Sequence, residues 1–458
     1  MRDFGTQGDP VTVFSKFSFV IGAVVAVGAF AGCKGPRAED RANVSQAVES
    51  RFGQPIGIEP PRRDRVIIPE SLERGESLAE DQAVLLALWN NALFHEQLVE
   101  LDLTKADLIQ AGLLPNPEFV YYWPVFDKQM KYLFDFPIES LYLRPIRLKS
   151  AAAENQRAAA RVTQLGLDLI RDTRQAYADL QLAQDRVGVA ERAVQVREKI
   201  LEIAESRLKA GDASELDVST ARIDVLIARQ DLIRIGYEVP VAGERLRNLI
   251  GLSGTTVELH SNGSAFDPRT ERTVDELVAD ATATRPDAVA AAAATHAAEI
   301  RVRFARLSWV RLLGLGDATS GLSGYHGSDH ELGPALRFTV PIFNQGQGLI
   351  SRAKAEYEQL ERRQLTVNNQ IVQDVRTSYA RFSQARAELD ALKSKTRPEV
   401  ETAIKRAEAA FAKGGVTYVI VLEMNRQLID TYAREAALYA DLRRSWAELE
   451  RSVGKKLK

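Results

Sequence analysis

Residues 169–211 read LIRDTRQAYADLQLAQDRVGVAERAVQVREKILEIAESRLKAG, and this stretch decides the fold. Alternating steps of four and three residues from Leu169 to Leu208 fall on an apolar side chain at ten of twelve positions. A sustained period of about 3.5 residues predicts a left-handed coiled coil. Because residues 146–210 contain no proline and no strong turn signal, they predict one helix of about 65 residues, roughly 98 Å long.

The stretch after Gly211 and Asp212 repeats this pattern. Apolar side chains occupy every seam position from Val218 to Leu249. A break of only two residues predicts that the second helix returns antiparallel to the first. Pro240 lacks a backbone N–H donor, so we expect the returning helix to kink near it.

The second half of the chain repeats the first half. Residues 174–178 (RQAYA) correspond to 376–380 (RTSYA), and residues 207–211 (RLKAG) correspond to 410–414 (AFAKG). A third match relates Pro137 to Pro341, and the three matches are separated by 202 to 204 residues along the chain. We call this separation, about 203 residues, the duplication offset. The chain is therefore predicted to contain a duplicated unit.

The two units are predicted to span residues 77–252 and 273–453. Each is expected to open with a shorter helix, because Ser77 with Glu80, and Thr273 with Glu276, have the spacing of a capping box. The first shorter helix is expected to end before Pro115.

A pair of short strands is predicted in each unit, over residues 117–139 and 311–342. Segments of about ten residues that are rich in Tyr, Trp and Phe fit the 9–11 residues of a tilted transmembrane β-strand. About eight strands make the smallest closed barrel, so four strands per chain require several copies of the chain to close one. Long hairpins are expected over residues 146–250 and 345–453, which makes the predicted fold class mainly α with a small β part.

The composition excludes several classes of protein. The chain has 458 residues, of which 45% are hydrophobic, and 60 basic against 62 acidic side chains give a net charge of −2. These values argue against a disordered chain and against a nucleic-acid binder. The single cysteine excludes an intramolecular disulfide and a multi-thiolate metal site. The sequence shows no catalytic-triad signature, P-loop or dinucleotide fingerprint, so neither enzymatic activity nor a cofactor is expected.

The N-terminus resembles an export signal. An apolar run from Phe17 to Phe30 is too short for a transmembrane helix but fits the central region of a signal peptide. Residues 31–33 (AGC) are similar to the lipobox of bacterial lipoproteins, which implies that Cys33 is acylated and begins the mature protein. An ordinary signal peptide or an uncleaved anchor would also explain the run. Residues 34–76, with five prolines, are predicted to form an extended linker.

The order of these elements is similar to that of the TolC-type outer-membrane efflux family, the outer membrane factors. The resemblance covers roughly residues 77–453. Its most specific points are four motifs, at residues 112–117 (GLLPNP), 211–218 (GDASELDV), 285–287 (RPD) and 341–348 (PIFNQGQG). The last of these looks like the subgroup that serves heavy-metal and cation efflux systems.

The resemblance implies a homotrimer in the bacterial outer membrane. Three chains would contribute four strands each to a twelve-stranded barrel in outer-membrane lipid, and the long helices would continue as an α-helical tunnel in the periplasm. The trimer would be the passive exit duct of a tripartite, RND-type efflux system, opened by a periplasmic adaptor and an inner-membrane pump. Because the pump selects the cargo, metal ions, drugs and polypeptides all stay open as substrates.

The resemblance also assigns residues to the adaptor-docking tips of the helices. By position, Gly211 and Gly414 would be the two tip glycines, and Ser214, Leu216 and Val416 would lie near the docking surface. A tight reversal between helices needs a residue with a positive φ, which favours glycine.

Two histidines and an aspartate fall in one loop of the second strand pair. His326, Asp329 and His330 are weak candidates for a metal site, because imidazole and carboxylate groups suit zinc or copper. A solvated loop is the commoner outcome for residues between two strands. Charged side chains such as Arg301, Arg303, Arg306 and Asp374 could line the tunnel, although a solvated helix face is the commoner outcome for them too.

A second class of function stays open. A lipid-anchored periplasmic coiled-coil scaffold without a pore would share the hairpins. A periplasmic adaptor would also present a hairpin, but adaptors normally place one hairpin between β-rich segments, whereas two hairpins and only four strands are predicted for this chain. Detergent-stable trimers with a β signal would favour the channel, and an elongated soluble species would favour the scaffold.

Overall fold

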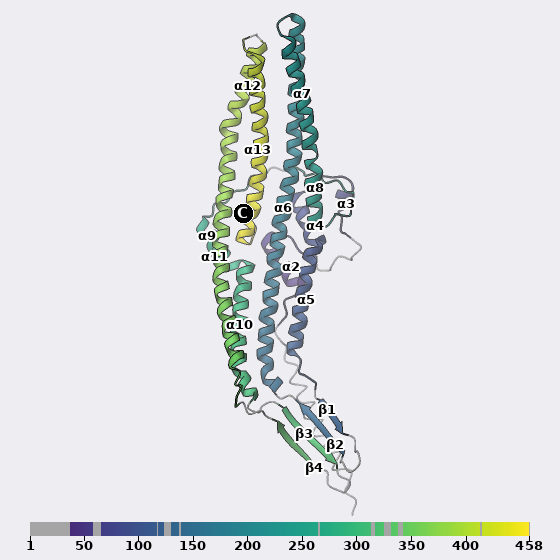
Figure 1. Cartoon of the computed structure of the whole chain (residues 1–458), viewed down its shortest axis with the longest axis vertical. Coiled ribbons are helices and arrows are strands. Elements are labelled where there is room, and N and C mark those ends of the chain that lie inside the picture. Colours follow the sequence, from purple (N-terminus) through teal and green to yellow (C-terminus); the bar gives the residue numbers. More distant parts are fainter. Residues whose placement is uncertain are drawn as a thin grey trace, which may run out of the picture.

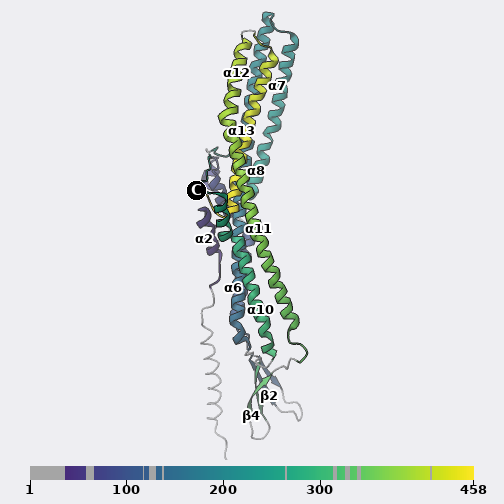
Figure 2. The same ribbon diagram turned by 90° about the vertical axis from the view of Figure 1, so that its left-hand side faces the viewer.

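A long rod of helices with a small sheet at one end forms the molecule (Figure 1). The computed structural model describes residues 37–57, 66–116, 118–122, 130–136, 139–263, 266–312, 317–324, 331–337, 342–412 and 415–457. Two helical hairpins extend together toward the end opposite the sheet, and shorter helices pack around the middle (Figures 1 and 2). None of the helices in these ranges is both long enough and apolar enough to cross a membrane.

Each half of the chain contributes the same order of elements. The first half contains α4 (Glu80–Asn90), α5 (Ala92–Gly112), β1 (Glu118–Tyr122), β2 (Met130–Phe136), α6 (Glu139–Ala210), α7 (Glu215–Gly236) and α8 (Glu238–Leu249). The second half contains α9 (Val274–Thr284), α10 (Pro286–Leu312), β3 (Asp317–Gly324), β4 (Glu331–Arg337), α11 (Gln347–Ala391), the π-helix η1 (Leu392–Thr396), α12 (Arg397–Ala412) and α13 (Tyr418–Val453). Two more helices, α2 (Arg41–Phe52) and α3 (Glu70–Glu73), precede them.

The first hairpin has the predicted register. Helix α6 is 72 residues long, and α7 runs back beside it from a reversal at Gly211 (Figure 1). The seam positions of α7 are buried at Val218, Ala221, Val225 and Ala228, as a coiled-coil seam requires. Helix α7 ends at Gly236, four residues before Pro240, because a proline ring clashes with the carbonyl of residue i−4. The predicted kink is therefore confirmed as a break between α7 and α8.

The second hairpin contains an irregularity that the first lacks. Helix α11 passes through η1 before α12 continues toward the tip. Pro398 at the start of α12 cannot donate to the carbonyl four residues before it, and the wider π-helical turns of η1 lie at that point. The two hairpins are thus related by duplication but differ in regularity.

Two expectations about the N-terminal segment are wrong. The extended linker predicted for residues 34–76 contains α2, whose Val44, Val48 and Phe52 are buried at a spacing of four residues. The capping box predicted at Ser77 and Glu80 is absent, and Ala79 caps α4 instead, with Gln82 accepting its N–H. The reason is that Leu78 has extended backbone, because its N–H donates to the carbonyl of His260 at 2.7 Å. The second capping box, at Thr273 and Glu276, is confirmed.

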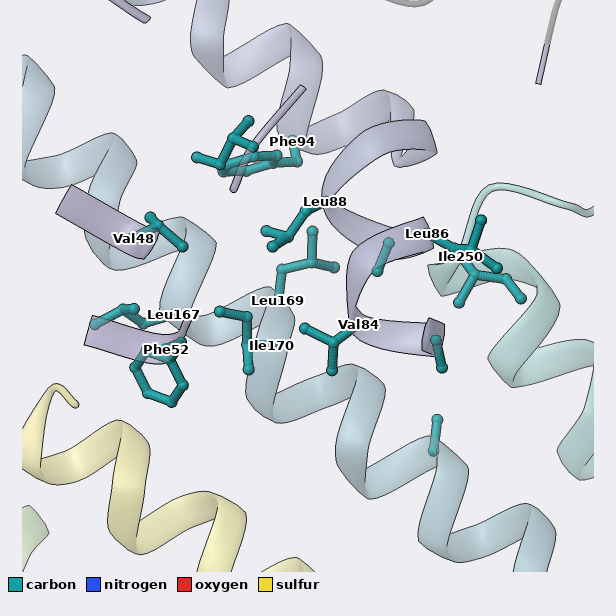
Figure 3. Close-up of a cluster of buried hydrophobic side chains, with 14 of the residues drawn as sticks. Val48, Phe52, Val84, Leu86, Leu88, Phe94, Leu167, Leu169, Ile170 and Ile250 are labelled. Carbon is teal, nitrogen blue, oxygen red and sulfur yellow. The ribbon is translucent and has the colours of Figure 1, made fainter. Parts of the chain in front are cut away.

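A hydrophobic core in the middle of the rod holds α2 and the shorter helices of the first half against α6. Figure 3 shows Phe52 of α2 and Leu88 of α4 converging on Leu167 and Ile170 of α6. A second core joins α9 to α11 and α13, where the Phe382 and Trp446 rings have centroids 5.0 Å apart. These two cores fix where each hairpin leaves the body of the molecule.

Each half of the chain contains an equivalent hydrogen bond from a side chain to a distant backbone carbonyl, which we call a clasp. In the first half the Asn91 side chain donates to the Leu249 carbonyl at 2.9 Å, and in the second the Arg285 side chain donates to the Ser452 carbonyl at 3.1 Å. The two acceptors, Leu249 and Ser452, are related by the duplication offset found in the sequence. Each clasp thus ties the start of the sheet-proximal helix to the end of the returning helix.

The four strands form one antiparallel sheet in the order β1-β2-β3-β4. Tyr121 pairs with Tyr132, and Phe134 pairs with Ser320 across the junction between the two halves. The second strand pair starts later than predicted, because α10 continues to Leu312 and β3 begins at Asp317. The duplication therefore brings two hairpins of strands together at one end of the rod.

Candidate functional site at the helical tips

The first helical tip is a well-defined reversal. Gly211 has φ +85°, its N–H donates to the Leu208 carbonyl at 3.0 Å, and the Asp212 N–H donates to the Arg207 carbonyl at 2.9 Å. This pair of bonds is the Schellman motif, which needs a residue with positive φ and so favours glycine. Gly211 therefore lies at the tip, where the sequence placed it.

Ser214 starts the returning helix by capping it. Its Oγ accepts the Asp217 N–H at 3.1 Å, and the Asp217 carboxylate accepts the Ser214 N–H at 3.0 Å and the Ser214 hydroxyl at 2.8 Å. These bonds, with the backbone N–H of Ser214 first, lower the pKa of Asp217 below its usual value. The cap keeps a carboxylate charged on the tip surface.

The second tip repeats this geometry with fewer polar groups. The Gly415 N–H donates to the Ala410 carbonyl at 2.9 Å, and the duplication offset relates this bond to the one from Asp212 to Arg207. Thr417 caps α13 by position, but its side chain makes no capping hydrogen bond. The two tips therefore share a backbone hydrogen bond, but only the first is capped through a side chain and carries the carboxylate of a capping box.

The most exposed apolar side chains of the two tips lie at equivalent positions. Leu216 on the first tip is 74% exposed and Val419 on the second is 68% exposed, and the duplication offset relates these two positions too. Val416 is instead half-buried against Ile200, Phe411 and Val421. Leu216 is therefore a surface residue, whereas Val416 packs against the other side chains of its own hairpin and the first one. The residue equivalent to Leu216 is Val419, and the duplication offset would have identified it from the sequence.

A groove lies between the two tips. Arg207, Asp212 and Asp217 line it from the first hairpin, and Phe411, Val416 and Thr417 line it from the second. The Arg207 guanidinium stacks over the Phe411 ring, 4.7 Å from its centroid, and this cation–π contact joins the hairpins. Sequence reasoning missed both residues of this contact. The groove offers apolar surface, one cation and two carboxylates, but no arrangement for a chemical step.

Several predicted site residues lie outside the described residues. They are Cys33, Gly414, His326, Asp329 and His330. Among the residues that are described, no cluster of three or more histidine, cysteine, aspartate or glutamate side chains could hold a metal ion. Asp374 is described, and it pairs with Arg285 at 3.2 Å and Arg451 at 3.4 Å in the middle of the rod.

The loss of the Ser214 cap gives the first testable prediction. Ser214→Ala is expected to destabilise the first turn of α7 by about 1 kcal/mol, because one of its N–H groups loses its acceptor. Hydrogen exchange should become faster at residues 215–218 of the variant, and the pKa of Asp217 should rise toward its usual value. Thr417→Ala is the matched control, because Thr417 makes no capping bond. Equal changes in the two variants would contradict the assigned cap.

The fold and the paired tips define an elongated protein of helical hairpins on a small antiparallel sheet. Solved structures share this fold. CusC has a TM-score of 0.69 at 15% identity, with 92% of this chain and 99% of that chain covered. The outer-membrane channel OprN has a TM-score of 0.67 at 16% identity, with 93% and 98% covered. The outer membrane protein VceC from Vibrio cholerae has a TM-score of 0.66 at 17% identity, with 83% and 97% covered.

A family model identifies the chain further. Residues 135–252 and 277–455 match the family described as outer membrane efflux protein, so the chain belongs to that family. No curated protein matches the sequence. The chain is therefore an outer-membrane efflux protein of the TolC type, in a family of channels rather than enzymes.

Proposed function

We propose that the chain is the exit duct of a tripartite, RND-type efflux system, and that it works as a homotrimer enclosing one passage. The open sheet carries this proposal. Strands β1 and β4 are its edges, and neither edge pairs with a further strand among the described residues. An open edge in a bilayer would leave backbone groups without partners, and four strands are too few to close a barrel. Three copies would supply twelve strands and remove every edge.

A second feature supports an assembly of several copies. Between Ile223 and Val241, helix α7 and the start of α8 carry an apolar stripe that is 50% to 71% exposed, although the buried seam of α7 already faces α6. The stripe consists of Ile223, Leu226, Ile227, Ile233, Tyr237 and Val241. A stripe of this length at near-heptad spacing is typical of a second coiled-coil seam. We assign it to packing against a neighbouring copy of the chain.

The helical tips are the proposed docking surface for a periplasmic adaptor, which joins the duct to an inner-membrane pump. Leu216 and Val419 would supply the apolar contacts, and the groove beside Arg207 would receive a side chain of the adaptor. Because the tips offer no chemistry, export through the duct would be passive and would depend on opening at this end.

We also propose that Cys33 anchors the chain to lipid. Asn155 of α6 holds the backbone of Glu39, accepting its N–H at 2.6 Å and donating to its carbonyl at 3.3 Å. Asn155 lies about 24 Å along α6 from the sheet-proximal start of that helix. The six residues from Glu39 back to Cys33 span at most about 22 Å. A segment fully extended toward the sheet would bring an acyl chain on Cys33 to the level at which the sheet begins.

The apolar stripe provides the test of the trimer. Ile227→Glu is expected to convert most of the detergent-solubilised trimer to monomer, because the buried carboxylate would have no partner in the interface. Helix content should stay unchanged, since Ile227 is 50% exposed within one chain. Light scattering in detergent and circular dichroism measure the two effects.

Ile227→Leu, which keeps an apolar side chain of the same volume at the same position, is the matched control and should leave the trimer intact. A wild-type trimer population for Ile227→Glu would refute the interface.

A double variant tests the docking surface at the tips. Leu216→Asp combined with Val419→Asp should abolish cross-linking to the adaptor and leave the conductance of the purified trimer unchanged.

A further inference from the structure

Basic side chains gather at the sheet-proximal ends of the helices. The ten residues nearest the sheet in α5, α6, α10 and α11 contain eight lysines and arginines against three carboxylates, a net charge of +5. The ten residues nearest the tips in α6, α7, α12 and α13 contain six against seven, a net charge of −1. The rod is thus electrically polarised along its length, with its positive end next to the sheet.

Exposed apolar side chains accompany these charges on α10 and α11. The two helices pack side by side next to the sheet (Figures 1 and 2). We use the name junction collar for the exposed side chains of these two helix ends and of the residues just before α11, and define it by Arg303, Arg306, Ile342, Phe343, Leu349 and Arg352. Phe343 is 92% exposed and Ile342 is 70% exposed, which is unusual for large apolar side chains in water.

The guanidinium groups of the collar are available to a ligand. Arg303 pairs with Glu299 at 2.5 Å and Arg352 pairs with Glu356 at 2.9 Å, each one turn away on its own helix. Exposed pairs of this kind contribute little free energy and exchange readily with other anions. Arg306 makes no ion pair with any carboxylate in the described part of the chain.

We propose that the junction collar binds anionic phospholipids of the leaflet that borders the helical end of the sheet. Arginines beside Phe, Ile and Leu match the boundary between headgroups and acyl chains, because the guanidinium can meet a phosphate while the apolar side chain enters the hydrocarbon. Continuity with the sheet and the local positive charge both favour this occupant. The inference rests on the proposed function, since it requires the sheet to lie in the outer membrane.

Lipid binding by the full-length oligomer tests the collar. The purified protein is delipidated in mild detergent and titrated with phosphatidylglycerol or phosphatidylcholine, and bound lipids are counted by native mass spectrometry. The triple variant Arg303→Gln, Arg306→Gln and Arg352→Gln is expected to bind phosphatidylglycerol at least tenfold more weakly, because each basic residue near an anionic surface contributes roughly fivefold. Its binding of phosphatidylcholine should stay unchanged.

A matched triple variant at the other end of the rod controls for net charge. Lys405→Gln, Arg406→Gln and Arg426→Gln removes the same charge from exposed positions near the tips and should change phosphatidylglycerol binding less than twofold. Phe343→Ser should weaken binding of both lipids, because it removes an apolar contact. Inorganic phosphate at millimolar concentration should not displace phosphatidylglycerol; displacement would mean that the collar is a site for free anions and would overturn the proposal.

Two other occupants of the collar predict different results. If the collar faces the passage, the arginine triple variant will shift the ion selectivity of single channels toward cations and keep wild-type lipid binding. If the collar contacts a second copy, the same variant will lose the trimer. Either result overturns the lipid assignment. A wild-type protein that neither trimerises nor conducts would refute the proposed function itself, which the lipid titration by itself does not measure.

Discussion

Ala228→Glu is expected to disrupt the first hairpin, with a loss of more than about 4 kcal/mol in the free energy of unfolding. Ala228 is 2% exposed, in the seam between α7 and α6. The substitution would bury a carboxylate in an apolar seam with no partner, and would also insert a long side chain where only a methyl group fits. Thermal unfolding followed by circular dichroism at 222 nm measures the effect.

Gln427→Glu adds the same charge at an exposed position of α13, outside the apolar stripe. It should change the free energy of unfolding by less than about 0.5 kcal/mol. If Ala228→Glu unfolds at the wild-type temperature, the coiled-coil register described for α6 and α7 is wrong.

The second large effect is expected at Glu450, which is 1% exposed on α13. Its carboxylate contacts the buried guanidinium of Arg174 on α6 and accepts the Leu457 N–H at 2.9 Å. Glu450→Ala should destabilise the protein by about 3–5 kcal/mol, because it leaves a buried guanidinium without its closest partner. Glu80, 3.5 Å from Arg174, compensates in part, so the lower end of this range is expected. Chemical denaturation in detergent checks the value.

A double variant separates the charge from the packing. Replacing the pair by Arg174→Met and Glu450→Leu should be less destabilising than Glu450→Ala by itself, because no unpaired charge stays buried. If the double variant is less stable than both the wild type and Glu450→Ala, the ion pair itself stabilises the fold. That result would refute the prediction that an unpaired buried charge causes the loss.

The same carboxyl group predicts a pH dependence. Burial raises the pKa of Glu450 above its usual value, although Arg174 opposes the shift. A group whose pKa is higher in the folded state contributes stability that is present below its unfolded pKa and is lost as the pH rises through its folded pKa. Glu450→Gln should remove this loss, so the stability of the variant should fall less between these two pKa values than that of the wild type.

The hairpins could be predicted from the sequence because their stability is local and periodic. A seam that repeats every 3.5 residues needs no knowledge of the rest of the fold, and Val218 to Ala228 are buried as that period requires. The cap at Thr273 was predictable for the same reason. The cap at Ser77 was not, because a contact with residue 260, far along the chain, determines the backbone at Leu78.

The N-terminal helix and part of the tip needed the structure. Prolines on both sides of α2 suggested a linker, yet Val44, Val48 and Phe52 have helical spacing and pack on α6. At the second tip, the resemblance points by position to Val416, which is half-buried, whereas Val419 is 68% exposed. Applying the duplication offset to each side chain of the first tip would have found it. The contact of Arg207 with Phe411 joins two hairpins, which no local pattern predicts.

Single-channel conductance of the purified full-length protein in a planar bilayer, together with its oligomeric mass in detergent, tests whether the chain forms a trimeric pore. We expect a trimer with a small and persistent conductance, because three four-stranded sheets would close one barrel above a tunnel that is narrow at its tips. A monomer that leaves the detergent and gives no conductance would refute the channel, and would mean that the hairpins serve as a scaffold without a pore.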